Sequence, residues 1–219
     1  AFQNCAKLTK VNMPKANVEF GRGCFAYCSN LTTIDLSYVE MIPEECFYSC
    51  SNLLRVNLDN CKEIGNYAFY NCAGIVGELV IPDSVQTLGR QSFYAMSKIT
   101  SIVIGTGMIN LCTYDYSYDR LPFYGASGVK EVTFKGINVP YMYSQGYYYD
   151  IFYSMNGLEK VYVPAESYEA YVNAYKSYVN NGKIITFNNT DEFIIEDGIL
   201  LLYQGNSQDV VIPDTVEVI

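Results

Sequence analysis

The sequence predicts an α/β repeat fold, a solenoid with a parallel β-sheet on one face and short helical turns opposite. Three observations support this prediction. The pattern Phe-x-x-(Cys/Met/Ala)-x-x-(Leu/Ile/Val) recurs along most of the chain, each copy continues into alternating apolar residues, and a second apolar pair near Gly or Pro precedes the next copy. Units of this kind stack, because one unit cannot bury its apolar face alone.

The repeated pattern occurs in about seven units. They begin at Phe2, Phe25, Phe47, Phe69, Phe93, Phe123 and Phe152. The usual spacing is about 23 residues, within the range of solenoid repeats. The fifth and sixth units are longer, which places inserted segments at 105–121 and 135–150. We therefore predict a solenoid over residues 1–163.

The residues that follow each Phe-containing turn predict a strand with one face turned inward. Apolar residues alternate over the ranges 31–36, 53–58, 99–104, 129–134 and 158–163. A period of two with many β-branched residues is typical of a half-buried strand. The fourth unit carries one extra residue and reaches Ile81. Strands of stacked units are expected to lie side by side in a parallel sheet.

The Phe of each unit is predicted to lie on a short helical turn. In the fourth unit Ala68, Phe69 and Cys72 have the spacings of one and three that bring side chains together on one helix face. Stacking would then align the Phe residues in a ladder inside the solenoid.

The repeat pattern stops after residue 163. The range 164–182 spaces its apolar residues by three and four behind Pro164 and Glu166, which predicts an amphipathic helix. The range 183–219 then predicts a short strand at 184–187 and a hairpin at 193–203 across an Asp-Gly turn. A further, truncated repeat begins at Val210. Both ends fall in mid-repeat, so we expect a fragment of a longer protein.

The composition excludes several functions. The chain has no His, which removes Ser-His-Asp and Cys-His nucleophiles and His-ligated zinc. A net charge of −9 without basic clusters argues against nucleic acid as a partner. No apolar run approaches the roughly 20 residues of a membrane helix, so no transmembrane segment is expected in this chain. No pair of carboxylates stands out as an acid and base, and we predict a non-catalytic protein without cofactor or metal.

The cysteines are predicted to be core residues. One slot of the repeat holds Cys5, Cys28, Cys50, Cys72, Met96, Ala126 and Met155, and another holds Ala1, Cys24, Cys46, Ala68 and Ser92. Slots that also accept Ala or Met require a small or adaptable apolar side chain. A free buried cysteine behaves as such a side chain. Packing of the cysteines in the core is therefore favoured over disulfides or a metal site. Cys61 takes the place of Val39, whereas Cys112 stands where other units have Gly or Pro and is the candidate for an exposed thiol.

The range 81–93 (IPDSVQTLGRQSF) resembles the repeat of the BspA-like bacterial leucine-rich-repeat family. The resemblance covers 1–163 and resumes at 210–216. It implies a leucine-rich-repeat solenoid, and it implies a secreted or surface-attached protein, since members of the family are typically such proteins of bacteria that live on animal hosts, and some are implicated in adhesion. We therefore expect an extracellular or cell-surface location, with the export signal outside this fragment.

Tyrosine is concentrated in the two inserted segments. The candidate partner-binding residues are Tyr114, Tyr116, Tyr118, Tyr141, Tyr143, Tyr147, Tyr148 and Tyr149. Tyrosine offers a large amphipathic contact area at a low cost in side-chain entropy, as in recognition loops. The alternative is that these rings pack onto the solenoid.

The resulting hypothesis is a binding or adhesion module that recognises a host or bacterial surface protein. Two alternatives stay open, namely a glycan-binding module that uses the same tyrosines and a passive structural spacer on the cell surface.

Overall fold

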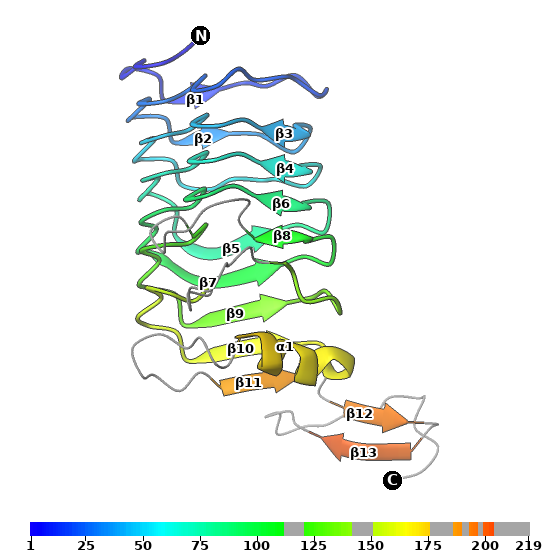
Figure 1. Ribbon diagram of the computed structural model, residues 1–219. Helices are drawn as coiled ribbons and strands as arrows, with labels where there is room; N and C mark the ends of the chain where they lie inside the picture. Colours follow the sequence, from blue (N-terminus) through cyan, green and yellow to red (C-terminus); the bar gives the residue numbers. More distant parts are fainter. Residues whose placement is uncertain (112–120, 142–150, 176–185, 190–192, 197–198, 204–219) are drawn as a thin grey trace.

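The computed structural model describes residues 1–111, 121–141, 151–175, 186–189, 193–196 and 199–203. Successive repeats lie one on another along a single direction from the N-terminus to β10 (Lys160–Val163), as Figure 1 shows. Each repeat contributes one layer, so residues about one repeat apart in sequence are neighbours in space.

Neighbouring repeats contribute strands that pair in parallel, as predicted. The first pair is β1 (Lys10–Val11) and β2 (Thr33–Ile34). The main sheet has the order β11-β10-β9-β7-β5, formed by β5 (Gly77–Ile81), β7 (Ile99–Ile104), β9 (Glu131–Phe134), β10 and β11 (Thr186–Asn189). Its register places Val132 opposite both Ile102 and Val161. The register between β5 and β7 shifts between Gly77 and Glu78, where Gly77 has a φ of 79°.

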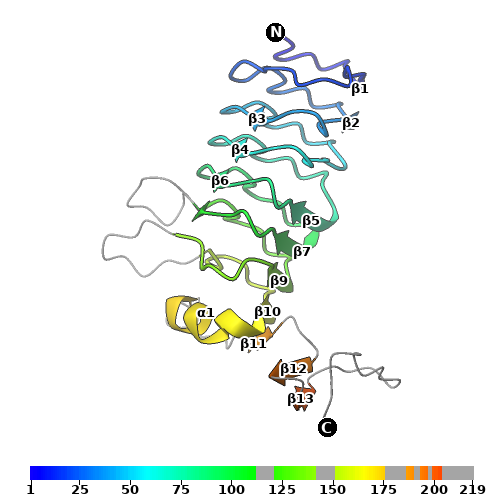
Figure 2. The same ribbon diagram turned by 90° about the vertical axis from the view of Figure 1, so that its right-hand side faces the viewer.

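A second parallel sheet arises from the apolar pairs that precede each Phe. It has the order β3-β4-β6-β8, with β3 (Met41–Ile42), β4 (Glu63–Ile64), β6 (Thr87–Leu88) and β8 (Asn110–Leu111). Figure 2 shows β3, β4 and β6 on one side of the repeats and β5, β7 and β9 on the other. The core therefore lies between two sheets and the turns that join them.

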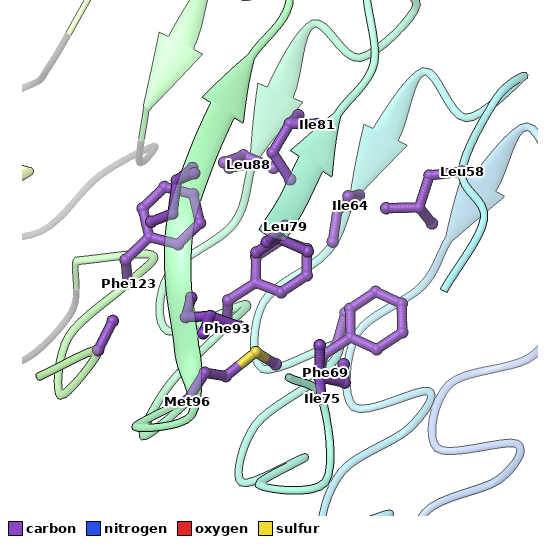
Figure 3. Close-up of a cluster of buried hydrophobic side chains, with 14 of the residues drawn as sticks. Leu58, Ile64, Phe69, Ile75, Leu79, Ile81, Leu88, Phe93, Met96 and Phe123 are labelled. Carbon is purple, nitrogen blue, oxygen red and sulfur yellow. The ribbon is translucent and has the colours of Figure 1, made fainter. Parts of the chain in front are cut away.

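The core contains a continuous ladder of phenylalanine rings. Phe25, Phe47, Phe69, Phe93 and Phe123 are at most 1% exposed, and successive centroids are 5.2 to 5.7 Å apart in stacked pairs. Aliphatic side chains of both sheets surround these rings, as Figure 3 shows for Phe69 and Phe93. This is the buried stripe that the recurrent Phe predicts.

The turns that carry these rings are not helices, which corrects the prediction of short helical turns. Glu45 and Ser49 have positive φ angles of 60° and 57°. The N–H groups of Glu45, Phe47 and Ser49 donate to carbonyls of the next repeat at 2.7 to 2.9 Å. A helix would use those N–H groups within its own turn. Among the described residues the helices are η2 (Ala165–Ser167) and α1 (Tyr168–Tyr175).

Six of the seven cysteines in the described residues are buried, and all seven are free. The thiols of Cys28, Cys50 and Cys72 donate hydrogen bonds to the carbonyls of Phe2, Phe25 and Phe47 at 3.0 to 3.1 Å. These thiols therefore link neighbouring repeats as well as filling the core, a role that comparison between the units does not predict. Cys112 lies outside the described residues.

The C-terminal part departs from the repeat. Within the predicted helical range 164–182, the structure describes η2 and α1, and residues 176–185 lie outside its description. Near the predicted strand at 184–187 lies β11, parallel to β10. The strands β12 (Phe193–Glu196) and β13 (Ile199–Tyr203) pair antiparallel. The Asp-Gly turn at 197–198 and the truncated repeat at 210–219 lie outside the described residues.

Replacement of Ser92 with alanine is expected to stabilise the protein by about 1 kcal/mol, because a buried hydroxyl without a partner carries an uncompensated desolvation cost. Ser92 is fully buried, and its Oγ has no hydrogen-bond partner among the described residues. The same slot holds Ala68 one repeat earlier. Urea unfolding gives the change in stability. The matched control is Ser167→Ala, which removes a hydrogen bond to Pro164 and should destabilise. A destabilised Ser92→Ala variant would contradict the prediction.

Candidate functional site

Tyr141 is the one predicted binding residue within the described part of the chain. Tyr114, Tyr116, Tyr118, Tyr143, Tyr147, Tyr148 and Tyr149 lie outside it. Tyr141 is 58% exposed, and its backbone is fixed to the preceding repeat. Its N–H donates to the carbonyl of Ile109 at 2.7 Å, and its carbonyl accepts from the N–H of Leu111 at 2.9 Å.

The described residues around the two tyrosine-rich segments are neighbours on adjacent repeats. Leu111 precedes the first segment and Tyr141 precedes the second, and the two are joined by the hydrogen bond just described. Leu121 and Ile151 follow the two segments and are both buried. Both segments therefore leave from adjacent positions of the fold and return to adjacent repeats.

Three large apolar side chains are exposed beside these departure points. Ile109, Ile137 and Tyr141 are 55%, 52% and 58% exposed, and we call this set the root patch. Ile109 and Tyr141 are hydrogen-bonded through their backbones, and Ile137 belongs to the chain segment that leads to Tyr141. Exposed apolar side chains in one part of a surface are candidates for contact with other molecules. Sequence analysis missed Ile109 and Ile137, because exposure of single residues in irregular segments leaves no periodic signal.

A second tyrosine feature was also missed. One tyrosine from each of six repeats forms a row along the turns, the surface ladder, made of Tyr27, Tyr48, Tyr70, Tyr94, Tyr124 and Tyr153. Its rings are stacked from Tyr48 onward, and Tyr27 is tilted against Tyr48. The closest centroids, those of Tyr70 and Tyr94, are 4.3 Å apart. Burial raises the pKa of Tyr70 to about 12. The signal in the sequence is the Phe-Tyr dipeptide that recurs from Phe47 onward. Rings within this row cover one another's faces, so they offer little surface on which a sugar could stack.

The sheet face of the first three repeats has a shallow hollow of about 670 Å³. Its charged residues are Lys10, Asp35 and Arg55, so it has no single sign. Hydrogen bonds from the hydroxyl and the N–H of Ser37 hold the pKa of Asp35 below its usual value. This carboxylate therefore serves as the acceptor in a local turn.

A groove on the other sheet is apolar with an acidic rim. Val18, Phe20 and Met41 line it together with Asn17, Glu19, Glu40, Lys62 and Glu63. Lys62 pairs with Glu40 at 2.7 Å, and both side chains are largely exposed, so this ion pair adds little stability.

The described residues contain no group of three or more His, Cys, Asp or Glu side chains that could hold a metal ion. The buried thiols are also poor nucleophiles. Burial raises the pKa of Cys50 to about 12 and that of Cys61 to about 11, so almost no thiolate forms at neutral pH. The geometry of this part of the chain offers surfaces for contact with other molecules.

The raised thiol pKa values predict a loss of stability in alkali. Below pH 9 the thiols of Cys50 and Cys61 are protonated in both the folded and the unfolded state, so they add no pH dependence. Between pH 9 and the folded pKa only the unfolded state releases the proton, and the free energy of unfolding falls by about 1.4 kcal/mol per pH unit for each thiol. Urea unfolding from pH 8 to 11 under reducing conditions measures this slope. Cys61→Ala should flatten it, and an equal slope in that variant would contradict the prediction.

The arrangement of parallel strands and irregular turns defines a class of repeat protein, and comparison identifies it. The family model described as BspA type leucine rich repeat region, in 6 copies, matches residues 1–100 and 40–194. The chain belongs to this family of BspA-type leucine-rich repeats. None of the curated proteins compared with it matches.

Solved structures resemble the fold. The pneumococcal vaccine antigen PcpA is similar with a TM-score of 0.60 and 19% identity, over 82% of this chain and 41% of that chain. A leucine-rich repeat protein from Bacteroides ovatus has a TM-score of 0.41 and 17% identity over 86% of this chain and 63% of its own. A leucine rich cell surface protein from Faecalibacterium prausnitzii has a TM-score of 0.27 and 14% identity over 85% and 75%. At these identities the likeness to PcpA shows the fold alone.

Within the described residues, none of the helices has the length and apolar character needed to cross a membrane.

Proposed function

We propose that this chain is a non-catalytic binding or adhesion module that acts outside the cell or on its surface and recognises a protein, either of a host or of another bacterium. One observation carries the proposal. The residues from which the two tyrosine-rich segments begin lie on adjacent repeats, and the exposed root patch of Ile109, Ile137 and Tyr141 lies in the same part of the chain.

The chemistry of this region favours a protein partner. Tyrosine and exposed aliphatic side chains are the residues that desolvate well at the centre of protein interfaces. The family supports the location, because the BspA-like resemblance implies a secreted or surface-attached protein.

Cell binding tests the proposal. The fluorescently labelled chain is added to cultured epithelial cells and to washed bacterial cells, each untreated, trypsin-treated or periodate-treated. We expect binding that trypsin abolishes and periodate leaves intact. Loss after periodate alone would replace the protein partner with a glycan, and no binding to any cell would favour a spacer and overturn the proposal.

A variant set locates the contact. Replacing Tyr114, Tyr116, Tyr118, Tyr143, Tyr147, Tyr148 and Tyr149 with serine should weaken binding at least about tenfold, as expected when interface aromatics are removed. The matched control replaces Tyr27 and Tyr48 of the surface ladder with serine and should bind normally. Equal binding by both variants would exclude the inserted segments as the contact site.

A further inference from the structure

The chain segment that carries two members of the root patch is held from one side by the preceding repeat. We call residues 135–141 the root segment. At its start the N–H of Lys135 donates to the carbonyl of Ile104 at 2.9 Å, and at its end the N–H of Tyr141 donates to that of Ile109 at 2.7 Å.

Helix α1 holds the same segment from the other side through two tyrosine hydroxyls. The Oη of Tyr171 lies 2.7 Å from the carbonyl oxygen of Gly136 and 3.1 Å from that of Asn138, and donates its proton to this pair. The Oη of Tyr175 donates to the carbonyl of Pro140 at 3.0 Å. Three alternate carbonyls of the root segment are thus bound to one helix.

The hydroxyl of Tyr175 replaces a donor that a further strand would supply. In earlier repeats the carbonyl that corresponds to that of Pro140 receives an N–H from the next repeat, as Glu40 does from Lys62 and Lys62 does from Gln86, each at 2.8 Å. After the root segment the described chain forms β10 and then α1, beside β11 (Figures 1 and 2), and among the described residues no strand of the second sheet follows. Backbone carbonyls left without donors would be costly, and the tyrosines of α1 satisfy them.

The two rings are fixed by the core. Tyr171 is fully buried and Tyr175 is 3% exposed. Their rings lie 4.9 and 5.8 Å from that of Phe134, and Tyr175 also contacts Phe152 at 5.5 Å. Burial raises the pKa of Tyr171, so its hydroxyl remains a donor well above neutral pH. The donors are therefore rigid.

We infer that Tyr171 and Tyr175 are positioning residues that preorganise the root patch for its protein partner. The anchored carbonyls lie on both sides of Ile137 and immediately before Tyr141. A surface that is already ordered loses less conformational entropy on binding. This inference rests on the proposed function, since it assigns a role to α1 within that binding surface.

The test removes only the two hydroxyls, in the variant Tyr171→Phe with Tyr175→Phe. Hydrogen exchange followed by mass spectrometry on the full chain should show exchange about fivefold to tenfold faster in peptides covering 136–141, with peptides of the central repeats unchanged. The affinity of the variant for the trypsin-sensitive sites on epithelial cells should fall about tenfold. Tyr168→Phe is the matched control, because it lies on the same helix and no hydrogen bond of its hydroxyl is recorded among the described residues.

Unchanged exchange at 136–141 in the double variant overturns the inference. Faster exchange with normal cell binding also overturns it, provided that root-patch substitutions do weaken binding. If root-patch substitutions leave binding intact, the proposed function itself fails, and the exchange result then reports separately on whether α1 orders the segment.

Discussion

Replacement of Phe69 with alanine is expected to lower the free energy of unfolding by about 3 to 5 kcal/mol, the usual cost of emptying a buried phenylalanine site. Phe69 is fully buried, and its ring stacks on those of Phe47 and Phe93 with centroids 5.2 Å apart on either side. Removing the ring leaves a cavity in the middle of the ladder and breaks two stacked pairs at once. Urea unfolding followed by circular dichroism measures the change.

The end of the ladder provides the control for Phe69. Phe2 stacks on Phe25 at 5.2 Å but is 45% exposed, so Phe2→Ala should cost much less. Repeat proteins depend on contacts between neighbouring units, and loss at the centre should separate the repeats on either side into two unfolding transitions. Similar losses from both variants would show that the ladder is not the main source of stability.

Replacement of Gly65 with alanine is expected to destabilise the protein by about 3 kcal/mol, at the upper end of the cost of overpacking. A Cβ at Gly65 would lie 2.6 Å from the backbone nitrogen of Glu44 and 2.9 Å from the carbonyl carbon of Pro43. Both atoms belong to the preceding repeat, so the two layers would have to move apart. The N–H of Gly65 also donates to the carbonyl of Ile42 at 2.8 Å, and that bond would lengthen.

Gly21→Ala is the matched control, since a Cβ at Gly21 would meet no heavy atom within 4 Å. It should change stability by less than about 0.5 kcal/mol, as surface substitutions usually do. Thermal or urea unfolding of the two variants side by side measures the difference. If Gly65→Ala is as stable as Gly21→Ala, the repeats are less tightly stacked than the structure shows.

The repeating features were predictable because they rest on side chains in fixed slots. Alternation over 99–104 and 129–134 gives strands, and the recurrent Phe gives a buried ladder. The turns were not predictable from the same slots. The spacing of Ala68, Phe69 and Cys72 suits a helix, but Tyr67 and Asn71 adopt positive φ angles of 57° and 56°. Such angles at residues other than glycine follow from hydrogen bonds to the next repeat, which a single unit does not reveal.

The candidate site was predictable only in part. Composition pointed to the tyrosine-rich segments and hence to Tyr141. Ile109 and Ile137 were missed, because nothing in their local pattern distinguishes an exposed aliphatic residue from a buried one. The contribution of Tyr171 and Tyr175 was also missed. Their spacing predicts a helix face, whereas the acceptors of their hydroxyls lie about 35 residues earlier in sequence.

The most direct test of the account compares two pairs of exposed apolar residues. Ile109→Asp with Ile137→Asp places charge in the root patch, and Met41→Asp with Leu54→Asp makes the same change at residues 54% and 47% exposed elsewhere. The measurement is the affinity of each labelled variant for trypsin-sensitive sites on epithelial cells. The account predicts a loss of at least about thirtyfold for the root-patch pair and near-normal binding for the control. Equal affinity of the two variants would contradict it.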